Sequence, residues 1–431
     1  MKRTRVEQKR MVKRKGETGK TGSKAGRRNM RGPVRGAGQS TVRRESRAGQ
    51  KTCCTRTAYH SWKSGKLPEG CRLCVEGRKL VLFVTGICPR KCFYCPLSDT
   101  KKNKDVIYAN EWKLENENDT KSMISEAELT GAKGAGITGG DPFARAGRTA
   151  KYIRLLKKKF GKDFHIHLYA PLELITGQKL KKLYDAGLDE IRIHPDFRSK
   201  KHWPKISLIK QHDWKVGMEI PALPGREKRT REIIDYFIGS LDFLNINELE
   251  ISDTNAQNLV RNGFTTKNSV SYGVEGSQQL AFRLMRKYGA KLPIHYCTTT
   301  LKDRVQLANR IKLRARNVAA RHDHITPDGM LVRGALYLHE LAPGFGYRKK
   351  LEKVKGSDSE RKRILRKLGR MRRKISEQYR IKKGYIGTDR DKLRLLTSPA
   401  IAGLIKQKDL KPAIVTEYPT WDQTEIEVQF L

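Results

Sequence analysis

The sequence is poor in acidic residues and has no long apolar run, and both shortages limit what the protein can be. Its 431 residues include 45 Asp and Glu against 91 Lys and Arg, a formal net charge of +46. No apolar stretch approaches the length of about 18 residues that a membrane-spanning helix needs. The N-terminus is basic throughout and lacks the apolar core of a signal peptide. We therefore expect a cytoplasmic protein whose cysteines stay reduced.

The shortage of apolar residues is uneven along the chain. Residues 1–50 hold 17 Lys and Arg, three Glu and almost no aliphatic pattern, so they cannot bury enough surface to fold alone. We expect a disordered basic tail there and a cysteine-bearing lead-in over residues 51–79. An α/β core over residues 80–300 and a basic C-terminal extension of mixed α and β structure over residues 301–431 would follow.

A second basic stretch covers residues 348–383, with 17 basic residues against four acidic ones. Within it, residues 360–368 have the pattern of a helix with a narrow apolar stripe and a broad basic face. A positive field of this size attracts polyanions, and structured RNA is the partner that it favours. A solvated tail and helix is the open alternative, because neither basic run has the interleaved aromatic residues of a base-stacking surface.

From residue 80 onward, strand-like and helix-like segments alternate. Such an order predicts a mostly parallel sheet with right-handed crossovers. The candidate strands are Leu80–Val84, Ala135–Thr138, Phe164–Tyr169, Glu190–His194, Val216–Ile220, Phe243–Glu250 and Leu292–Cys297. The candidate helices are Ser125–Lys133, Arg148–Lys159, Thr176–Ala186, Lys228–Gly239 and Gln278–Tyr288, with a basic helix over Val305–Arg321 beyond the core.

Several of these strands have one apolar and one polar face, because side chains alternate across a strand. In residues 164–169, Phe, Ile and Leu alternate with His165, His167 and Tyr169. In residues 191–194, two isoleucines alternate with Arg192 and His194. Covering helices would take the apolar faces, so the polar faces predict a wet interior that binds a polar ligand. For each histidine, an interior residue whose ring is hydrogen-bonded within the protein is as good an interpretation as a functional residue.

Three cysteines, Cys88, Cys92 and Cys95, follow the first predicted strand in a C-x3-C-x2-C run. Such a triplet offers three thiolates to one [4Fe–4S] cluster and leaves the fourth iron without a protein ligand. Zinc usually takes four ligands in two pairs, and the run has no fourth ligand nearby. The triplet therefore predicts an iron–sulfur site.

The remaining cysteines form a looser pattern. Cys71 and Cys74 make a C-x2-C pair upstream of the first strand, and Cys297 ends a late strand beside His295. These three cysteines predict an auxiliary iron–sulfur site; a zinc site on the same residues, or no metal, stay open. The adjacent pair Cys53–Cys54 is a weaker candidate for metal binding.

The cysteine triplet, with Tyr94 before its last member, resembles the signature of the radical S-adenosylmethionine (radical SAM) superfamily. Residues 138–142, Thr-Gly-Gly-Asp-Pro, resemble the G-G-E-P motif of that superfamily, with Asp141 in place of Glu. Within the superfamily, the chain resembles an archaeal group related to pyruvate formate-lyase activating enzymes over about residues 58–345. The segments that carry this likeness are 70–74, 81–86, 134–142, 164–169 and 217–221.

The resemblance implies a partial or full (β/α) barrel that holds a [4Fe–4S] cluster and SAM. Reductive cleavage of SAM would give a 5′-deoxyadenosyl radical, which abstracts hydrogen from a substrate. A one-electron donor such as ferredoxin or flavodoxin would supply the electron. The resemblance implies that SAM meets Gly139, Gly140, Asp141 and Pro142, and that its adenine lies near Tyr94.

Two further residues, Glu219 and Asn245, lie on later strands, and the direction in which they face predicts a role toward SAM or substrate. The substrate stays open between an RNA nucleoside, which the basic runs favour, and a protein, as in the activation of a glycyl radical enzyme. A nucleic-acid-binding protein with a structural metal is the non-enzymatic alternative.

Overall fold

The computed structural model describes residues 54–431; the expected basic tail and Cys53 lie outside the described residues. Seven parallel strands form the centre of an eleven-stranded sheet, in the order β11-β10-β9-β8-β7-β6-β3. They match the seven strands expected from the sequence. Their bounds are β3 (Lys79–Phe83), β6 (Gly134–Thr138), β7 (His165–Pro171), β8 (Glu190–His194), β9 (Lys215–Ala222), β10 (Phe243–Glu248) and β11 (Ile294–Cys297).

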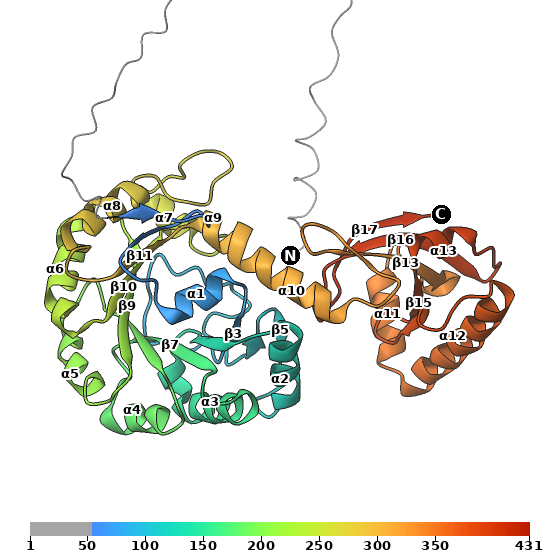
Figure 1. Ribbon diagram of the computed structural model, residues 1–431, viewed down its shortest axis with the longest axis horizontal. Helices are drawn as coiled ribbons and strands as arrows, with labels where there is room; N and C mark the ends of the chain where they lie inside the picture. The colour runs from blue at the N-terminus through green and yellow to red at the C-terminus, as the bar shows by residue number, and fades with distance from the viewer. Residues whose placement is uncertain (1–53) are drawn as a thin grey trace, which may run out of the picture. The chain divides into compact units, whose positions relative to one another are not determined.

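Helices cover the outer face of this curved sheet (Figure 1). They are α2 (Thr120–Leu129), α3 (Ala146–Phe160), α4 (Gly177–Tyr184), α5 (Ile206–Ile209), α6 (Glu227–Phe237) and α8 (Ser277–Tyr288). Apolar residues spaced three or four apart, such as Ile153 and Leu156 of α3, form the core with Ile166 and Leu168 of β7. The helix expected over Ser125–Lys133 is displaced, because Asp119 accepts the backbone N–H of Ser122 and caps α2 five residues earlier.

The barrel is partial, because its two outermost parallel strands do not pair with each other. Strand β3 pairs instead with the short hairpin β4 (Tyr108–Ala109) and β5 (Trp112–Lys113). Strand β11 pairs with β2 (Trp62–Ser64), which in turn pairs with β1 (Thr55–Arg56). Such two- and three-residue strands give no period-2 signal, so the sequence did not predict them.

A short helix, α1 (Glu69–Val75), lies inside the barrel and contacts β3, β6 and β7 (Figure 1). A Cβ atom at Gly70 would lie 2.4 Å from Nδ1 of His167 and 2.5 Å from Nη2 of Arg192. Only glycine therefore lets α1 approach the strands this closely. The lead-in region thus supplies part of the barrel interior.

After the barrel come α9 (Thr299–Leu301), a π-helical turn (Lys302–Leu307) and α10 (Ala308–Val318). The helix expected over Val305–Arg321 is present, but the helical stretch begins earlier, at Thr299, and ends earlier, at Val318, with the π-helical turn inside it. Arg314 of α10 forms a buried ion pair of 2.9 Å with Glu126 of α2.

The last third of the chain forms a second, antiparallel sheet in the order β14-β15-β13-β16-β17, with β12 beside β13. Arg394, which has no exposed side-chain surface, pairs there with Asp389 and Glu417. The strands are β12 (His324–Ile325), β13 (Leu331–Leu338), β14 (Ile386–Asp389), β15 (Arg394–Thr397), β16 (Leu410–Glu417) and β17 (Glu425–Phe430).

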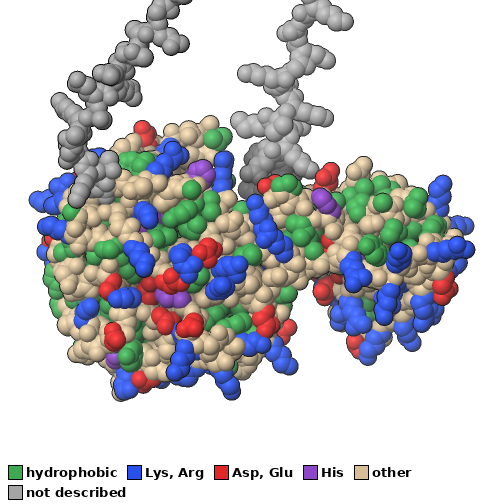
Figure 2. Space-filling model, in the orientation of Figure 1, with side chains coloured by type: hydrophobic (Ala, Val, Ile, Leu, Met, Phe, Trp, Pro, Cys, Tyr) green, Lys and Arg blue, Asp and Glu red, His purple; other side chains and the backbone are tan. Residues whose placement is uncertain are grey.

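Three helices, α11 (Tyr347–Lys355), α12 (Asp358–Gln378) and α13 (Pro399–Leu404), accompany this sheet. Helix α12 buries Ile364, Leu368 and Ile375, which confirms the narrow apolar stripe. Figure 2 shows Lys and Arg side chains gathered over α11 and α12. No helix of residues 54–431 has the length and apolar character to cross a membrane.

Candidate active site

The three clustered cysteines lie on the irregular loop after β3 and line one cavity of about 320 Å³. Thr85, at the start of this loop, donates its hydroxyl to Oδ1 of Asp105 at 2.8 Å. The same carboxylate pairs with Arg148 of α3 at 2.6 Å, and Arg148 also donates to the carbonyl of Val84. These contacts tie both ends of the loop to α3, so the sulfur atoms keep a fixed place at the carboxyl end of the sheet.

The Gly-Gly bend after β6 lies directly against this loop. The backbone N–H of Gly140 donates to the carbonyl of Thr85 at 2.8 Å, and that of Asp141 donates to the carbonyl of Ile87 at 2.8 Å. A Cβ atom would lie 2.4 Å from the carbonyl oxygen of Thr85 at Gly139, and 2.5 Å from that of Ile87 at Gly140. Both positions therefore require glycine, and both glycines line the same cavity as the cysteines.

The donor set of this loop fits a [4Fe–4S] cluster. Three thiols from one short loop open onto one cavity, and they are the ligands that such a cluster takes. Burial raises the pKa of Cys88 to about 11 and also raises that of Cys92, so without metal both sulfurs hold their protons at neutral pH. Bound iron would displace these protons, because the thiolate is the ligand.

Polar side chains from the carboxyl ends of four strands complete the cavity. They are Tyr169 of β7, Arg192 and His194 of β8, Glu219 of β9 and Asn247 of β10. Functional residues of (β/α) barrels gather at this end of the strands. The cavity is therefore lined by three thiols, by the backbone of the Gly139–Gly140 bend and by polar side chains.

The carboxylate of Glu219 is held by three hydrogen-bond donors. Its Oε2 accepts hydrogen bonds from Nη1 of Arg192 at 3.1 Å and from Nδ2 of Asn245 at 3.0 Å. Its Oε1 accepts one from Nδ2 of Asn247 at 2.9 Å. Three donors from two neighbouring strands thus hold the carboxylate in one orientation at the cavity surface.

Tyr94 connects the cysteine loop to the opposite side of the cavity. Nδ1 of His194 lies 2.7 Å from the backbone carbonyl of Glu219, which can only accept, so this nitrogen carries the proton. Nε2 therefore accepts the hydroxyl of Tyr94 at 2.9 Å. Burial lowers the pKa of His194 to about 4, so the imidazole is neutral at physiological pH.

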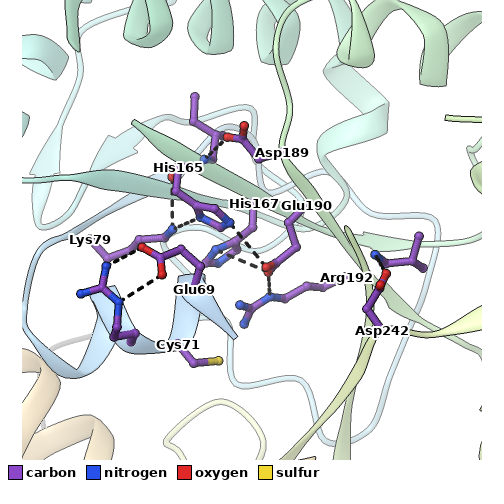
Figure 3. A network of polar contacts seen from close by, with 12 residues as sticks. Glu69, Cys71, Lys79, His165, His167, Asp189, Glu190, Arg192 and Asp242 are labelled. Carbon is purple, nitrogen blue, oxygen red and sulfur yellow. Dashed lines mark hydrogen bonds and ion pairs between the residues drawn. The ribbon is translucent and has the colours of Figure 1, made fainter. Parts of the chain in front are cut away.

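Below the cavity, buried charges follow one another across the barrel interior (Figure 3). Nζ of Lys79 lies 2.9 Å from Nδ1 of His165, whose Nε2 lies 3.5 Å from Glu190. Glu190 pairs with Arg192 at 2.5 Å, and Arg192 pairs with Glu219. The polar faces expected for these strands do point inward. Their side chains bond to one another, so the part of the interior next to α1 is filled by protein groups.

Seven of the ten residues predicted to bind the cluster or SAM line the cavity. Cys88, Cys92, Cys95, Tyr94, Gly139, Gly140 and Glu219 line the cavity, whereas Asp141, Pro142 and Asn245 do not. Oδ1 of Asp141 accepts the N–H of Phe143 at 2.9 Å and caps a 3₁₀ turn, while its buried Oδ2 has no partner among the described residues. Burial raises the pKa of Asp141 to about 6. Asn245 lies behind Glu219.

The three cysteines of the predicted auxiliary site lie in or beside the barrel interior. Sγ of Cys71 receives a hydrogen bond of 3.2 Å from Nδ2 of Asn245, and Cys297 is buried at the end of β11. Cys74 lies one turn after Cys71 on α1. Among residues 54–431, no three Cys, His, Asp or Glu side chains converge as ligands of a single metal ion. The auxiliary cluster stays a prediction.

Sequence reasoning missed other cavity residues, notably Arg90, Asn247 and Lys302. For Asn247 a signal was present, because Asn245 and Asn247 stand two residues apart and so share a strand face. It also missed Glu190, which precedes Arg192 and His194 in the same alternation. Arg90 gave no such signal, since only the fold brings it to Glu173, at 2.6 Å.

Comparison with known proteins identifies the class. A family model described as the radical SAM superfamily matches residues 82–237. A protein of Methanocaldococcus jannaschii, named provisionally as a glycyl-radical enzyme activating enzyme, is 43% identical over 280 residues, which cover 63% of this chain and 74% of that protein. The chain belongs to the radical SAM superfamily. It is an enzyme, and its cofactors are a [4Fe–4S] cluster and SAM.

Solved structures of the superfamily resemble the chain only distantly. Coproporphyrinogen III oxidase of Escherichia coli is 13% identical, with a TM-score of 0.32, and the match covers 55% of this chain and 58% of that one. HydG, a maturase of the [FeFe]-hydrogenase, is 11% identical with a TM-score of 0.32, covering 58% of this chain and 65% of that one. The chain thus spans less than two thirds of the length of either protein.

Proposed function

We propose that the enzyme cleaves SAM reductively in the cavity described above and directs the resulting radical to a glycine-containing protein segment. The observation that supports the chemistry is the cavity itself, which Cys88, Cys92 and Cys95 share with Gly139 and Gly140. When bound, a [4Fe–4S] cluster would supply the electron that splits the sulfonium of SAM into methionine and a 5′-deoxyadenosyl radical.

The chain's own residues would bind and orient the cluster and SAM, and they would exclude water from the cavity. Cys88, Cys92 and Cys95 would hold the cluster. The Gly139–Gly140 bend, whose missing side chains admit the carbonyls of Thr85 and Ile87, holds the cysteine loop beside the place where SAM would bind. Glu219, fixed by its three donors, can accept hydrogen bonds from hydroxyl or ammonium groups in the cavity, while Arg192 balances its charge. A thiol-ligated site of this kind supports a reducing, cytosolic location.

One feature supports a protein target: the Methanocaldococcus jannaschii relative carries the name of an activating enzyme for a glycyl-radical enzyme.

The chemistry is tested with the anaerobically reconstituted full chain, SAM and dithionite, by mass spectrometry of 5′-deoxyadenosine. Production of 5′-deoxyadenosine that is absent in Cys92→Ala supports the proposal. Reconstituted protein that carries iron but makes none refutes it. The target class is tested by electron paramagnetic resonance of a candidate glycyl-radical enzyme after incubation, where a new organic radical is expected.

RNA is a second candidate substrate, favoured by the basic face of α12. Lys362, Arg363 and Lys367 pair with acidic neighbours. The exposed side chains of Arg366, Arg370, Arg372, Arg373 and Lys374 form no ion pair with any residue of the described part of the chain. With no aromatic residues among them, they suit the phosphates of a folded RNA better than unstacked bases.

This candidate is tested by the salt dependence of binding to a labelled RNA hairpin. Arg370→Glu/Arg373→Glu should weaken binding through the loss of about two phosphate contacts. The slope of log K against log salt concentration should become shallower by about 0.7–0.9 for each lost contact. The control is Arg154→Glu/Lys158→Glu, on two exposed cations of α3. If the α12 variant and the α3 variant weaken binding equally, the basic face of α12 contributes only general electrostatic attraction.

A further inference from the structure

A second cavity, of about 600 Å³, lies against the same cysteine loop. Arg90, Cys92 and Tyr94 line both cavities, so the loop separates them. The rest of the second cavity is lined by Pro89, Lys91 and Phe93 of the loop, by the segments that follow β7, β8 and β9, and by Asn262. One side of the loop therefore faces the Gly139–Gly140 bend and Glu219, and the other side faces this second cavity.

The second cavity is predominantly positive. Five cations, Arg90, Lys91, Arg198, Arg226 and Arg229, line it together with two carboxylates, those of Glu173 and Asp196. The charges that line the first cavity are more nearly balanced: the cations are Arg90, Lys102, Arg192 and Lys302, and the carboxylates are Glu219, Glu248 and Glu250.

Part of this charge is neutralised inside the protein. Arg90 pairs with Glu173 at 2.6 Å, and Arg229 pairs with Glu232 at 2.6 Å. Asp196 accepts the backbone N–H of Arg198 at 2.9 Å. Lys91, Arg198 and Arg226 are exposed, and no acidic side chain of residues 54–431 forms an ion pair with them. Three cations are thus available to an external partner.

We propose that this cavity and its cationic rim are the docking surface for an acidic one-electron carrier protein. The inference rests on the proposed function, in which each SAM cleavage consumes one electron. SAM and substrate would occupy the first cavity, so the electron has to arrive from the other side of the loop. Electron transfer weakens steeply with distance, and the second cavity reaches Cys92 itself.

Charge complementarity identifies the occupant. Small flavin or iron–sulfur carriers with an acidic surface would be attracted by the rim, and opposite potentials raise association rates. Redox encounters are small and transient, so a patch of a few exposed cations is sufficient. A phosphate-bearing RNA would meet the same charges, and the test separates it from a protein carrier.

The test compares two reductants in the variant Arg198→Glu/Arg226→Glu. Neither side chain lines the first cavity. With reduced flavodoxin as donor, the KM for the carrier should rise about tenfold or more, because two attractive rim charges become repulsive. With dithionite, which needs no docking, 5′-deoxyadenosine formation should be unchanged. The control is again Arg154→Glu/Lys158→Glu on α3, which makes the same change in net charge and should leave both rates unchanged.

A binding measurement provides a readout that does not depend on a loaded enzyme. Calorimetric titration of the iron-free full chain with flavodoxin should show salt-sensitive binding that the rim variant weakens and the α3 variant does not. Wild-type binding that the rim variant retains overturns the docking surface, and so does a parallel loss of dithionite-driven activity. Loss of RNA-hairpin binding, with flavodoxin binding intact, would assign the rim to RNA instead. If wild-type protein makes no 5′-deoxyadenosine with dithionite, the proposed function fails, while the titration still decides on docking.

Discussion

Replacement of Arg192 by methionine tests the structure most directly. The Arg192 side chain is 2% exposed and pairs with Glu190, also 2% exposed, and with Glu219. Methionine matches much of its length but removes the cation, which leaves two carboxylates without their charge partner. Removing one member of a buried ion pair costs about 3–5 kcal/mol. We expect Arg192→Met to lower the free energy of unfolding of the barrel by that amount.

The assay is urea unfolding of the full chain without cofactors, with hydrogen exchange of the peptides from β7 and β8 to report on the barrel alone. Arg192→Met/Glu190→Gln should recover about 1–3 kcal/mol, because it removes one of the unpaired charges. Arg154→Met on the exposed face of α3 should stay within about 0.5 kcal/mol of wild type. A loss below about 1 kcal/mol in Arg192→Met, or no recovery in the double variant, would show that the buried pair is not formed.

Three further changes address the cavity. Gly140→Ala places a Cβ 2.5 Å from the carbonyl of Ile87 and should cost about a hundredfold in SAM cleavage by shifting the cysteine loop; Gly147→Ala, with nothing within 4 Å, should be silent in the same assay. Cys92→Ala should lose the visible absorbance and most of the iron of the reconstituted protein while the far-ultraviolet circular dichroism stays unchanged, and full retention of iron would contradict the ligand assignment. Tyr94→Phe loses the hydrogen bond to His194, worth about 1 kcal/mol; the change should appear in thermal unfolding, and an unchanged melting temperature would argue against that bond.

The sequence predicted the seven parallel strands because each has a strong alternation or a continuous buried run. Ile166 and Leu168 pack outward against helices, and His165 and His167 point inward, as the period of two requires. The cysteine triplet and the Gly-Gly bend could be paired in advance because both follow strands of a parallel sheet. Their carboxyl ends meet at one edge, and β3 and β6 prove to be neighbours.

What the sequence could not give are contacts set by tertiary packing. Helix α1 is seven residues long, too short for a helical period to appear, and its place inside the barrel depends on the absence of a side chain at Gly70. Arg90 meets Glu173 across 83 residues of sequence, and Arg229 reaches the second cavity from α6. Local patterns do not report such separations, so the second cavity is visible only in the structure.

The buried charges beneath the cavity are better explained by their positioning of Glu219 than by a contribution to stability. A well-packed apolar set in place of Lys79, Glu190 and Arg192 could be equally stable, since desolvation offsets most of the attraction between buried charges. Such a set could not hold the carboxylate of Glu219 at the cavity surface, because Nη1 of Arg192 is one of its three donors. Arg192 in turn is held by Glu190, and Glu190 lies next to His165 and Lys79. The series Lys79, His165, Glu190 and Arg192 therefore fixes the direction of one carboxylate where SAM and its substrate would meet. Replacing the whole series by a well-packed apolar set should cost orientation at Glu219 rather than stability.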